Sequence, residues 1–190
     1  MIGVISVDEL VLTVPNKEHE QQAREFVKEF LDYNSKMHGT GSLEEYIDNY
    51  DGWLEKIENS AKGINLKEGY APASTYFVVR ESDNKIVGMV NIRHELTERL
   101  LIHGGHIGDC IRPTERRKRY ATEALFFALK KCHELGIERV LVTCDKNNIG
   151  SVKQIQNNFG ILENEVKEDD MLFQRYWIDV EYAISNKRVR

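Results

Sequence analysis

Cysteines are scarce in this sequence, and none is placed as a metal site or a disulfide framework requires. Cys110, Cys132 and Cys144 are widely spaced and odd in number, and no two of them are separated by just two residues. Zinc sites and small disulfide-bonded folds normally show such pairs, so we expect neither of them, and no bound metal. We interpret the three residues as reduced thiols of an intracellular, cytoplasmic protein.

Long apolar runs and a basic overall charge are also missing. No apolar run approaches the roughly 20 residues that a membrane span needs, and the first residues lack the basic start and apolar core of a signal peptide. With a net charge of -5, the chain is not expected to wrap nucleic acid. We therefore expect one domain over residues 1–190, whose partners are neither membrane nor nucleic acid.

Against this acidic background, one short basic run immediately precedes a long amphipathic helix pattern. The run is Arg116-Arg117-Lys118-Arg119, with Arg112 just upstream. Cations are unfavourable at a helix N-terminus, because the helix dipole places partial positive charge there. The unpaired amides of a first helical turn bind anions, typically phosphate, which resolves the conflict. The run predicts a phosphate-bearing ligand, although a basic run considered alone is more often solvated surface.

Hydrophobic periodicity divides the chain into strands and helices. Apolar positions three and four apart predict helices over 16–34, 42–59, 120–135 and 148–158. Short β-rich runs predict strands over 10–14, 75–80, 86–93, 106–111, 139–144, 161–166 and 172–179. Ser42 followed by Glu45 is typical of a capping box, so the second helix is expected to begin at Ser42. The central strand-helix-strand unit predicts a right-handed parallel crossover.

In order along the chain, these features resemble the GNAT superfamily of N-acetyltransferases, in its bacterial small-enzyme branch. The superfamily's signature is Arg or Gln, two residues of any kind, Gly, one further residue, then Gly or Ala, between a strand and a long helix. Arg116 and Ala121 match this signature, whereas Arg119 occupies the position of the central glycine. The segment Asn148-Ile149-Gly150-Ser151 resembles the Asn-x-x-Ala/Ser element after the next strand. The resemblance covers roughly residues 73–179.

The resemblance implies a mixed α/β, α+β-like fold, with a central mixed, mostly antiparallel sheet flanked by helices. It implies transfer of an acetyl group from acetyl-CoA to a primary amine of a small molecule or peptide, by direct attack in a ternary complex. It also implies a homodimer formed through the last strands, unless Tyr176 and Trp177 belong to the core. The residues implied to contact coenzyme A are Cys110, Ile111, Arg112, Arg116, Arg117, Lys118, Arg119, Tyr120, Ala121, Thr122, Asn148 and Ser151.

The residue at position 119 decides how well such a loop binds coenzyme A. If the loop needs a positive φ there, the β-carbon of Arg119 costs about 1–2 kcal/mol relative to glycine. The backbone amide survives the change, and the added cation offsets part of the cost. We expect coenzyme A to bind, because the remainder of the pattern is intact.

Catalysis needs a base that removes a proton from the amine and an acid for the leaving thiolate. We favour His106 as the base, because histidine titrates near neutral pH, and Asn148 as a contact to the acyl region. A histidine in such a position is more often structural than catalytic, and Asn148 is equally interpreted as a helix cap. Asp109, three residues after His106, points to the opposite face of an ideal strand. Further alternatives for the base are His94, Glu95 and His103.

The acid is harder to find. The resemblance places a Tyr seven residues after the Asn, where this chain has Ile155. The enzyme therefore lacks that acid or obtains it elsewhere, with Tyr176 and Cys144 as distant candidates. Cys110 as an acyl-carrying nucleophile has no evident activating partner in the sequence.

The acceptor is expected to enter from the side of the first two helices. Their connection, 38–42, is interpreted as a mobile lid. The acidic residues after it either attract a cationic amine or form a solvated face: Glu44, Glu45, Asp48 and Asp51. Two other functions stay open. Arg119 and the missing Tyr favour a catalytically silent acyl-CoA-binding module, and the Arg-rich run favours a nucleic-acid-binding protein, which the net charge counts against.

Overall fold

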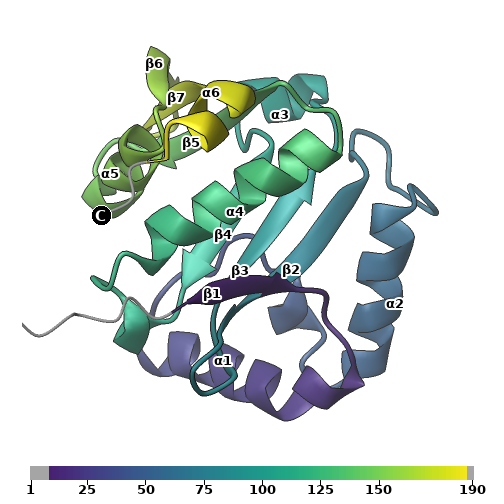
Figure 1. Ribbon diagram of the computed structural model, residues 1–190. Coiled ribbons are helices and arrows are strands. Elements are labelled where there is room, and N and C mark those ends of the chain that lie inside the picture. Colours follow the sequence, from purple (N-terminus) through teal and green to yellow (C-terminus); the bar gives the residue numbers. More distant parts are fainter. Residues whose placement is uncertain (1–8, 188–190) are drawn as a thin grey trace, which may run out of the picture.

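The computed structural model describes residues 9–187, whose strands form two sheets flanked by helices (Figure 1). The first sheet has the order β1-β2-β3-β4 and the second β5-β7-β6, with antiparallel neighbours throughout the described ladders. The strands are β1 (Leu10–Thr13), β2 (Ala73–Arg80), β3 (Lys85–Arg93), β4 (Ile107–Ile111), β5 (Arg139–Asp145), β6 (Ile161–Glu168) and β7 (Met171–Asp179). The α-helices are α1 (Glu20–Asp32), α2 (Tyr50–Ala61), α3 (Glu98–Ile102), α4 (Tyr120–Glu134), α5 (Ile149–Asn157) and α6 (Val180–Ser185). The predicted fold class is confirmed.

The two sheets touch at the start of β4 and are not paired beyond it. The His106 amide donates to the Leu141 carbonyl over 2.8 Å, and a β-carbon on Gly105 (φ 62°) would collide with that same carbonyl. From Ile107 onward, the ladders of the described residues pair β4 with β3 alone. The single sheet expected around the central crossover is therefore divided into two, and one edge of β4 is left without a strand partner.

Side chains alternate between the two faces of the first sheet and form two cores. On one face, α1 and α2 bury Phe26 and Trp53 against Phe77 of β2. On the other face, α4 buries Leu125 against Val90 of β3, in a core that continues to β5, α5 and β7. Figure 1 shows α4 on the opposite side of the sheet from α1 and α2. The site residues on β4 thus lie between two rigid layers.

The start of the first predicted helix agrees with the structure, and the start of the second does not. The expected helix over 16–34 is confirmed as a 3₁₀ turn followed by α1, with Asn16 accepting from the Glu18 amide. The capping box at Ser42 is wrong: Ser42 has φ 66° and makes no side-chain cap, and only a 3₁₀ turn, Leu43–Glu45, follows it. α2 begins at Tyr50, where the Asn49 side chain accepts from the Gly52 amide.

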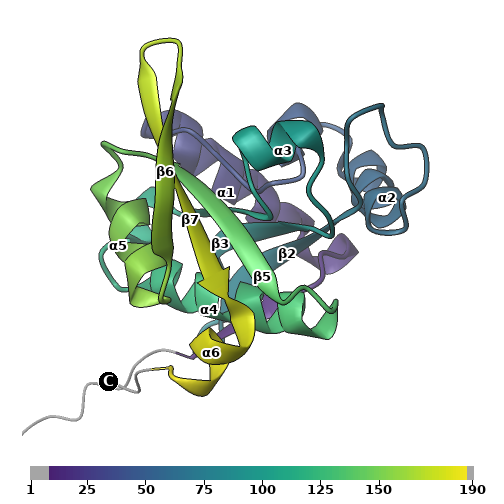
Figure 2. The same ribbon diagram turned by 90° about the horizontal axis from the view of Figure 1, so that it is seen from above.

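Two further features complete the fold. The short helix α3, between β3 and β4, was not predicted; the Thr97 hydroxyl accepts from the Leu100 amide at its start. β6 and β7 form a long hairpin that projects beyond the remainder of the molecule in Figure 2. Tyr176 of β7 is buried in the core, whereas Trp177 faces the opposite way and lies under the Arg139 guanidinium.

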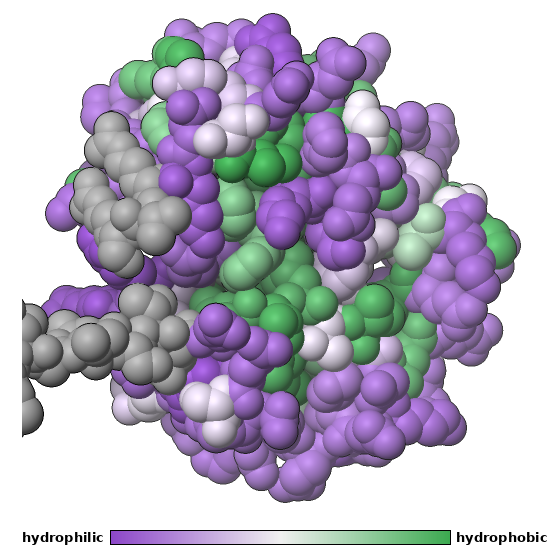
Figure 3. All heavy atoms as spheres, viewed as in Figure 1, coloured by the Kyte–Doolittle hydropathy of each residue, from purple (hydrophilic) through white to green (hydrophobic). Residues whose placement is uncertain are grey.

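The surface in Figure 3 has apolar side chains across its middle, between hydrophilic regions. Leu12, Tyr76 and Phe127 are partly buried and pack against the core under α4. None of the helices in residues 9–187 is both long and apolar enough to cross a membrane. Over the same range, no three histidine, cysteine or acidic side chains gather as a metal site would require.

Candidate active site

The loop between β4 and α4 passes twice through the left-handed region of backbone conformation. Arg117 has φ 65° and Arg119 has φ 69°, so the loop does need a positive φ at the position where the sequence pattern has glycine. Within the described chain, the backbone amides of Arg117, Lys118 and Arg119 meet no acceptor. α4 begins directly afterwards at Tyr120, so these donors lie at the positive end of its dipole. The loop thus has the backbone geometry of an anion site.

The buried side chain of Glu115 fixes the position of this loop through ion pairs. Its buried carboxylate receives three cations, Lys85 at 2.6 Å, Lys118 at 2.7 Å and Arg80 at 2.8 Å. Burial works to raise the pKa of Glu115, but the hydrogen bonds from these cations outweigh it and lower the pKa to about 2. Arg80 also donates to the Tyr120 hydroxyl. The carboxylate therefore ties β2, β3 and the loop to the start of α4.

The expected coenzyme contacts divide into engaged and unengaged cations. Arg112 is buried and pairs with Glu29 of α1 at 2.8 Å. Arg116 donates to the Ile111 carbonyl at 3.1 Å and to the Ser35 hydroxyl at 2.7 Å. Lys118 pairs with Glu115, as above. In the described part of the chain, Arg117 and Arg119 are exposed and form no ion pair. They are the two cations of the run that are available to an anionic ligand.

The other expected contacts at this end have mostly structural positions. Tyr120 is buried, and Ala121 packs partly buried against the core under α4. The Thr122 carbonyl accepts from Asn158 at 3.0 Å. Cys110 and Ile111 are buried on β4, and their side chains belong to the two different cores. Such residues reach a ligand only through their backbone groups.

Asp109 lies on β4, between the loop and the point where the sheets meet. Its carboxylate accepts from the Gln154 amide of α5 at 2.9 Å, so this bond bridges the two halves of the molecule. Burial raises the pKa of Asp109 to about 6, and the Gln154 bond only partly opposes it. An acid with a pKa near the working pH has the right strength for general base catalysis. Gln154 was not predicted as part of the site.

His106 is held as a structural residue. It is buried, and its ring Nδ1 accepts from the Leu141 amide at 2.9 Å. Burial, with a contribution from Arg93, lowers the pKa of His106 to about 4. Such a ring binds no proton at neutral pH and has already used one nitrogen to join β4 to β5. The geometry does not support the prediction that His106 is the base.

Asn148 and Ser151 are brought together as a helix cap. The Asn148 Oδ1 accepts from the Ser151 amide at 3.2 Å, at the start of α5. Both side chains lie at the surface of the helix start, and the predicted contact of Asn148 with the acyl region stays a prediction. Ile155, where the resemblance places a Tyr, is buried in the core. No phenol therefore approaches the site from that position.

The remaining candidates for proton transfer differ in their surroundings. His94 shares a hydrogen bond of 2.9 Å with Ser74, and Glu95 is exposed. His103 pairs with Glu168 at 3.2 Å and packs edge-on against Phe173. Each of these groups is paired or solvated, away from the free edge of β4.

The candidate thiols and the phenol are poor acids and nucleophiles. Burial raises the pKa of Cys110 to about 12 and that of Cys144 to about 11. The Tyr176 hydroxyl donates to Gln174 at 2.7 Å, and burial raises the pKa of Tyr176. A thiol that stays protonated has little nucleophilic strength, so Cys110 does not suit covalent catalysis.

The connection between α1 and α2 is held against the sheet instead of lying free as a lid. Gly39 (φ 69°) is so close to the Gly108 backbone that a β-carbon on it would collide there. The Trp53 indole donates to the Thr40 and Gly41 carbonyls at 3.2 Å each. The backbone of the connection is thus held both at Gly39 and at the Thr40–Gly41 pair.

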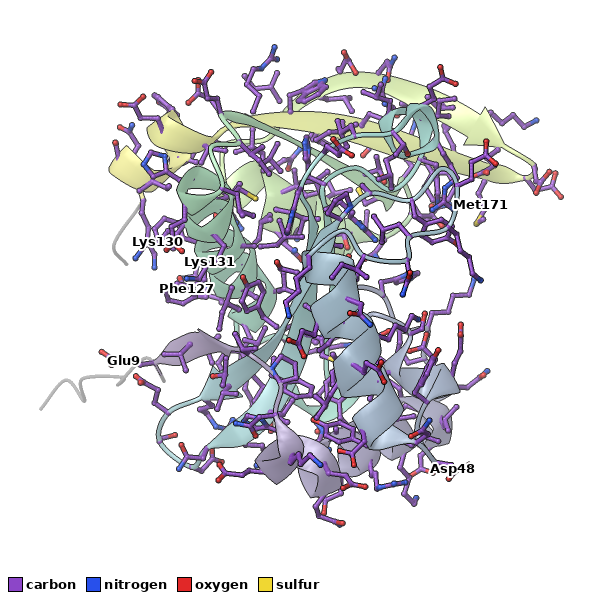
Figure 4. All side chains as sticks on the ribbon, turned by 90° about the vertical axis from the view of Figure 1, so that its right-hand side faces the viewer. Glu9, Asp48, Phe127, Lys130, Lys131 and Met171 are labelled. Atoms are coloured by element: carbon purple, nitrogen blue, oxygen red, sulfur yellow. The ribbon has the colours of Figure 1, made fainter. Side chains whose placement is uncertain are left out.

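The acidic residues of this connection mostly form a solvated face. Glu44 accepts from the Thr40 hydroxyl at 2.6 Å, and Asp51 pairs with Lys17 at 3.1 Å. Asp48 is fully solvated. Figure 4 shows Asp48 on the same side of the molecule as Met171 at the tip of the β6–β7 hairpin, and opposite Phe127 of α4. Met171 and Asp48 mark the two ends of the side from which the acceptor is expected.

Comparison with known proteins gives the family of the chain. A family model described as an acetyltransferase (GNAT) domain matches residues 21–158. The chain therefore belongs to the GNAT family of acetyltransferases, as the resemblance implied. Among curated proteins, none is similar enough in sequence to be counted as a relative.

Solved structures with the same fold include three enzymes of this family. The ribosomal-protein-S5-alanine acetyltransferase of Vibrio fischeri has 12% identity and a TM-score of 0.67, covering 90% of this chain and 93% of its own. RimJ of Mycobacterium smegmatis, in complex with CoA-disulfide, has 16% identity and a TM-score of 0.65, covering 92% and 89%. RimL, a ribosomal L7/L12 alpha-N-protein acetyltransferase in complex with coenzyme A, has 15% identity and a TM-score of 0.65, covering 94% and 97%. At these identities the likeness concerns the fold.

Proposed function

We propose that this protein is an acetyl-CoA-dependent N-acetyltransferase that acts on a primary amine. The observation that carries the proposal is the β4–α4 loop, where three unengaged amides and two unpaired arginines meet the N-terminus of α4 beside a free strand edge. A pyrophosphate suits the loop, and an extended amide-bearing arm suits the edge. RimJ and RimL, which share the fold, are described in complex with CoA-disulfide and with coenzyme A, which supports the same ligand here.

In this proposal the pyrophosphate of acetyl-CoA binds the amides of residues 117–119 and the first turn of α4. Arg117 and Arg119 add charge-assisted hydrogen bonds to its oxygens, which an arginine donates in pairs. The pantetheine arm lies along the free edge of β4, against the backbone of Cys110 and Ile111. This places the thioester near Asp109, three residues beyond the contact of β4 with β5 at His106.

Proton transfer follows from that placement. The acceptor enters as an ammonium ion, and the Asp109 carboxylate accepts one of its protons. The neutral nitrogen attacks the thioester carbonyl, and collapse of the tetrahedral intermediate breaks the carbon–sulfur bond. The nitrogen loses its second proton, which the departing coenzyme A thiolate takes up, and the amide product and coenzyme A leave. The transfer is direct, because the pKa of Cys110 is raised too far for an acyl-cysteine intermediate.

The experiment measures thioester consumption with a panel of primary amines, for the wild type and Asp109→Asn. We expect at least one amine to be acetylated by the wild type, and Asp109→Asn to reduce kcat by about 10²- to 10⁴-fold with acetyl-CoA binding retained. Binding of acetyl-CoA without turnover of any amine would instead indicate a silent acyl-CoA-binding module. That second function is favoured by Ile155, which fills the core where the resemblance places an acid.

We further propose a cytoplasmic homodimer. Ile161 and Leu162 on β6 are 74% and 44% exposed, an unusual exposure for apolar side chains on an outer strand, and burial in a second copy removes it. The three free cysteines are consistent with a reducing compartment. Sedimentation equilibrium tests the dimer: Ile161→Lys is expected to yield monomers, and a monomeric wild type contradicts it.

A further inference from the structure

A guanidinium without a carboxylate partner lies over Gly108 of β4, on the side of α1 and α2. Arg93 is the last residue of β3 and is half-buried. Its Nη1 donates to the Gly104 carbonyl at 3.2 Å. No carboxylate of the described residues lies within 4.0 Å of it. A guanidinium has five N–H donors, and a half-buried one normally has most of them satisfied.

The absence of a side chain on Gly108 lets this guanidinium pack directly over β4. Both terminal nitrogens of Arg93 lie 3.1–3.2 Å from the position that a β-carbon on Gly108 would take, and the Gly39 amide nitrogen lies 3.3 Å from it. Within residues 9–187, the Gly39 amide has no acceptor. Nitrogen donors from β3 and from the α1–α2 connection therefore converge over one residue of β4. That residue immediately precedes Asp109, whose side chain points to the opposite face of the strand.

The charges around this point favour an anion. Burial, with a smaller contribution from repulsion by Arg99, lowers the pKa of Arg93 to about 10. Burial and then Lys36, with further contributions from Arg93 and His103, lower the pKa of His38. The acids nearby are already engaged, Glu44 by the Thr40 hydroxyl and Glu168 by His103. A ligand carboxylate would supply the missing negative charge and accept two parallel hydrogen bonds from one guanidinium.

We infer that the acceptor carries a carboxylate near its reacting amine. Arg93 binds this carboxylate on one face of β4, and the amine reaches past the free edge of the strand to Asp109, which takes its proton. The inference rests on the proposed N-acetyltransferase function and names its substrate class, an amino acid or a peptide with a carboxylate close to its amine. Polyamines lack the group that Arg93 binds. Arg93 is then a specificity residue that contacts the substrate.

The test uses ω-amino acids of increasing chain length and the matched ω-amino amides. Each pair differs in the carboxylate alone, and the series covers the unknown spacing between amine and anion. Binding to the coenzyme A-saturated protein is measured by calorimetry, and thioester consumption is measured in parallel. For at least one length, the acid is expected to bind about tenfold more tightly than its amide, a typical value for one charge-assisted pair.

Four variants test whether Arg93 causes the preference for the acid. Arg93→Met is expected to abolish it, and Gly108→Ala to weaken it, because its β-carbon displaces the guanidinium. Arg139→Met is the matched control: Arg139 is exposed and lies over the Trp177 ring, so this change removes the same charge elsewhere and is expected to leave the preference unchanged. Arg93→Lys, which keeps the charge without the fork, is measured if Arg93→Met does not fold, and is expected to lose most of the preference.

The outcomes separate this inference from the proposed function. Absence of turnover with every amine, together with acetyl-CoA binding, overturns the function, while the binding ratios of acid to amide still decide the inference. Equal binding of acid and amide at every chain length overturns the inference. So does a preference that persists in a folded Arg93→Met or Arg93→Lys protein.

Discussion

Arg117 and Arg119 each combine a strained backbone with an available charge. Both have positive φ, where a β-carbon costs about 1–2 kcal/mol relative to glycine. Neither forms an ion pair in the part of the chain that the structure describes, whereas Arg112, Arg116 and Lys118 are engaged elsewhere. The two strained residues are thus also the unpaired cations of the run, and phosphate binding is the function that we propose for the strain.

Replacing one of them by glycine separates these two effects. Arg119→Gly relieves the strain but removes a cation, so we expect acetyl-CoA affinity to fall about tenfold. Stability is expected to change by no more than about 1 kcal/mol, because glycine also gains freedom in the unfolded chain. Calorimetry and urea unfolding measure the two quantities. Lys130→Ala, on the exposed face of α4 (Figure 4), removes the same charge away from the loop and is expected to leave affinity unchanged.

Asp109 predicts a specific pH dependence of the rate. Its pKa is raised to about 6 by burial, and only the ionised carboxylate accepts a proton. The rate at saturating acetyl-CoA is therefore expected to rise as the pH passes through about 6 and then to level. Asparagine at this position has no ionisable carboxylate, so the residual rate of Asp109→Asn should not rise as the pH passes through about 6. A step that is retained in Asp109→Asn assigns the base to another residue.

At the scale of elements, Glu115 joins two strands and a loop. Three cations surround its carboxylate, whose side chain is 5% exposed. A buried charge with such partners is costly to remove, because the partners are left uncompensated. The position of the loop, and hence of Arg117 and Arg119, depends on this one side chain.

Glu115→Gln is expected to lower the free energy of unfolding by about 3 kcal/mol at neutral pH. The pKa of Glu115 is depressed from 4.5 to about 2, so its contribution is fully present above pH 4.5 and is lost as the pH falls towards 2. In urea unfolding, the difference in free energy of unfolding between the wild type and Glu115→Gln should therefore become smaller as the pH is lowered from 4.5 to about 2. A difference that does not depend on pH would mean that the carboxylate's charge is not what stabilises the loop.

The starts of the helices show which element boundaries the sequence determines. Asn16 and Asn148 cap their helices as local patterns predict. Ser42 has the sequence of a capping box, but its left-handed backbone turns the hydroxyl away from the amides that follow. That backbone is held by the packing of Gly39 against Gly108 of β4 and by the hydrogen bond from the Trp53 indole. Both are tertiary contacts, which the local sequence around Ser42 does not contain.

At the scale of the whole molecule, the sequence predicted the family and the order of the strands and of the four longer helices, but not the short helices α3 and α6. It did not predict that the sheet is divided in two. The two parts are joined by hydrogen bonds between His106 and Leu141. The sequence favoured His106 over Asp109 as the base, because an unperturbed histidine titrates nearer to neutral pH than an aspartate does. In the folded protein, burial lowers the pKa of His106 to about 4 and raises that of Asp109 to about 6. Arg93 and Gln154 carry no sequence signal, since their partners are distant in the chain.

The charge distribution of the whole molecule predicts how it responds to salt and polyanions. The net charge is -5, and the two free arginines form a local exception. Acetyl-CoA affinity should fall as salt is raised, because exposed charges are screened. The protein should not be retained on DNA at physiological ionic strength. Retention on a DNA column would contradict the assignment of the basic run to a small ligand.

A calorimetric titration of the protein with acetyl-CoA tests the central claim, that the β4–α4 loop binds this coenzyme. We expect saturable binding to the wild type, and weakening of at least about tenfold when Arg117 and Arg119 are both changed to alanine. The double Arg→Ala protein should unfold like the wild type, so the loss would belong to the loop. The absence of saturable heat at millimolar acetyl-CoA, or equal affinity in the wild type and the double variant, would contradict the claim.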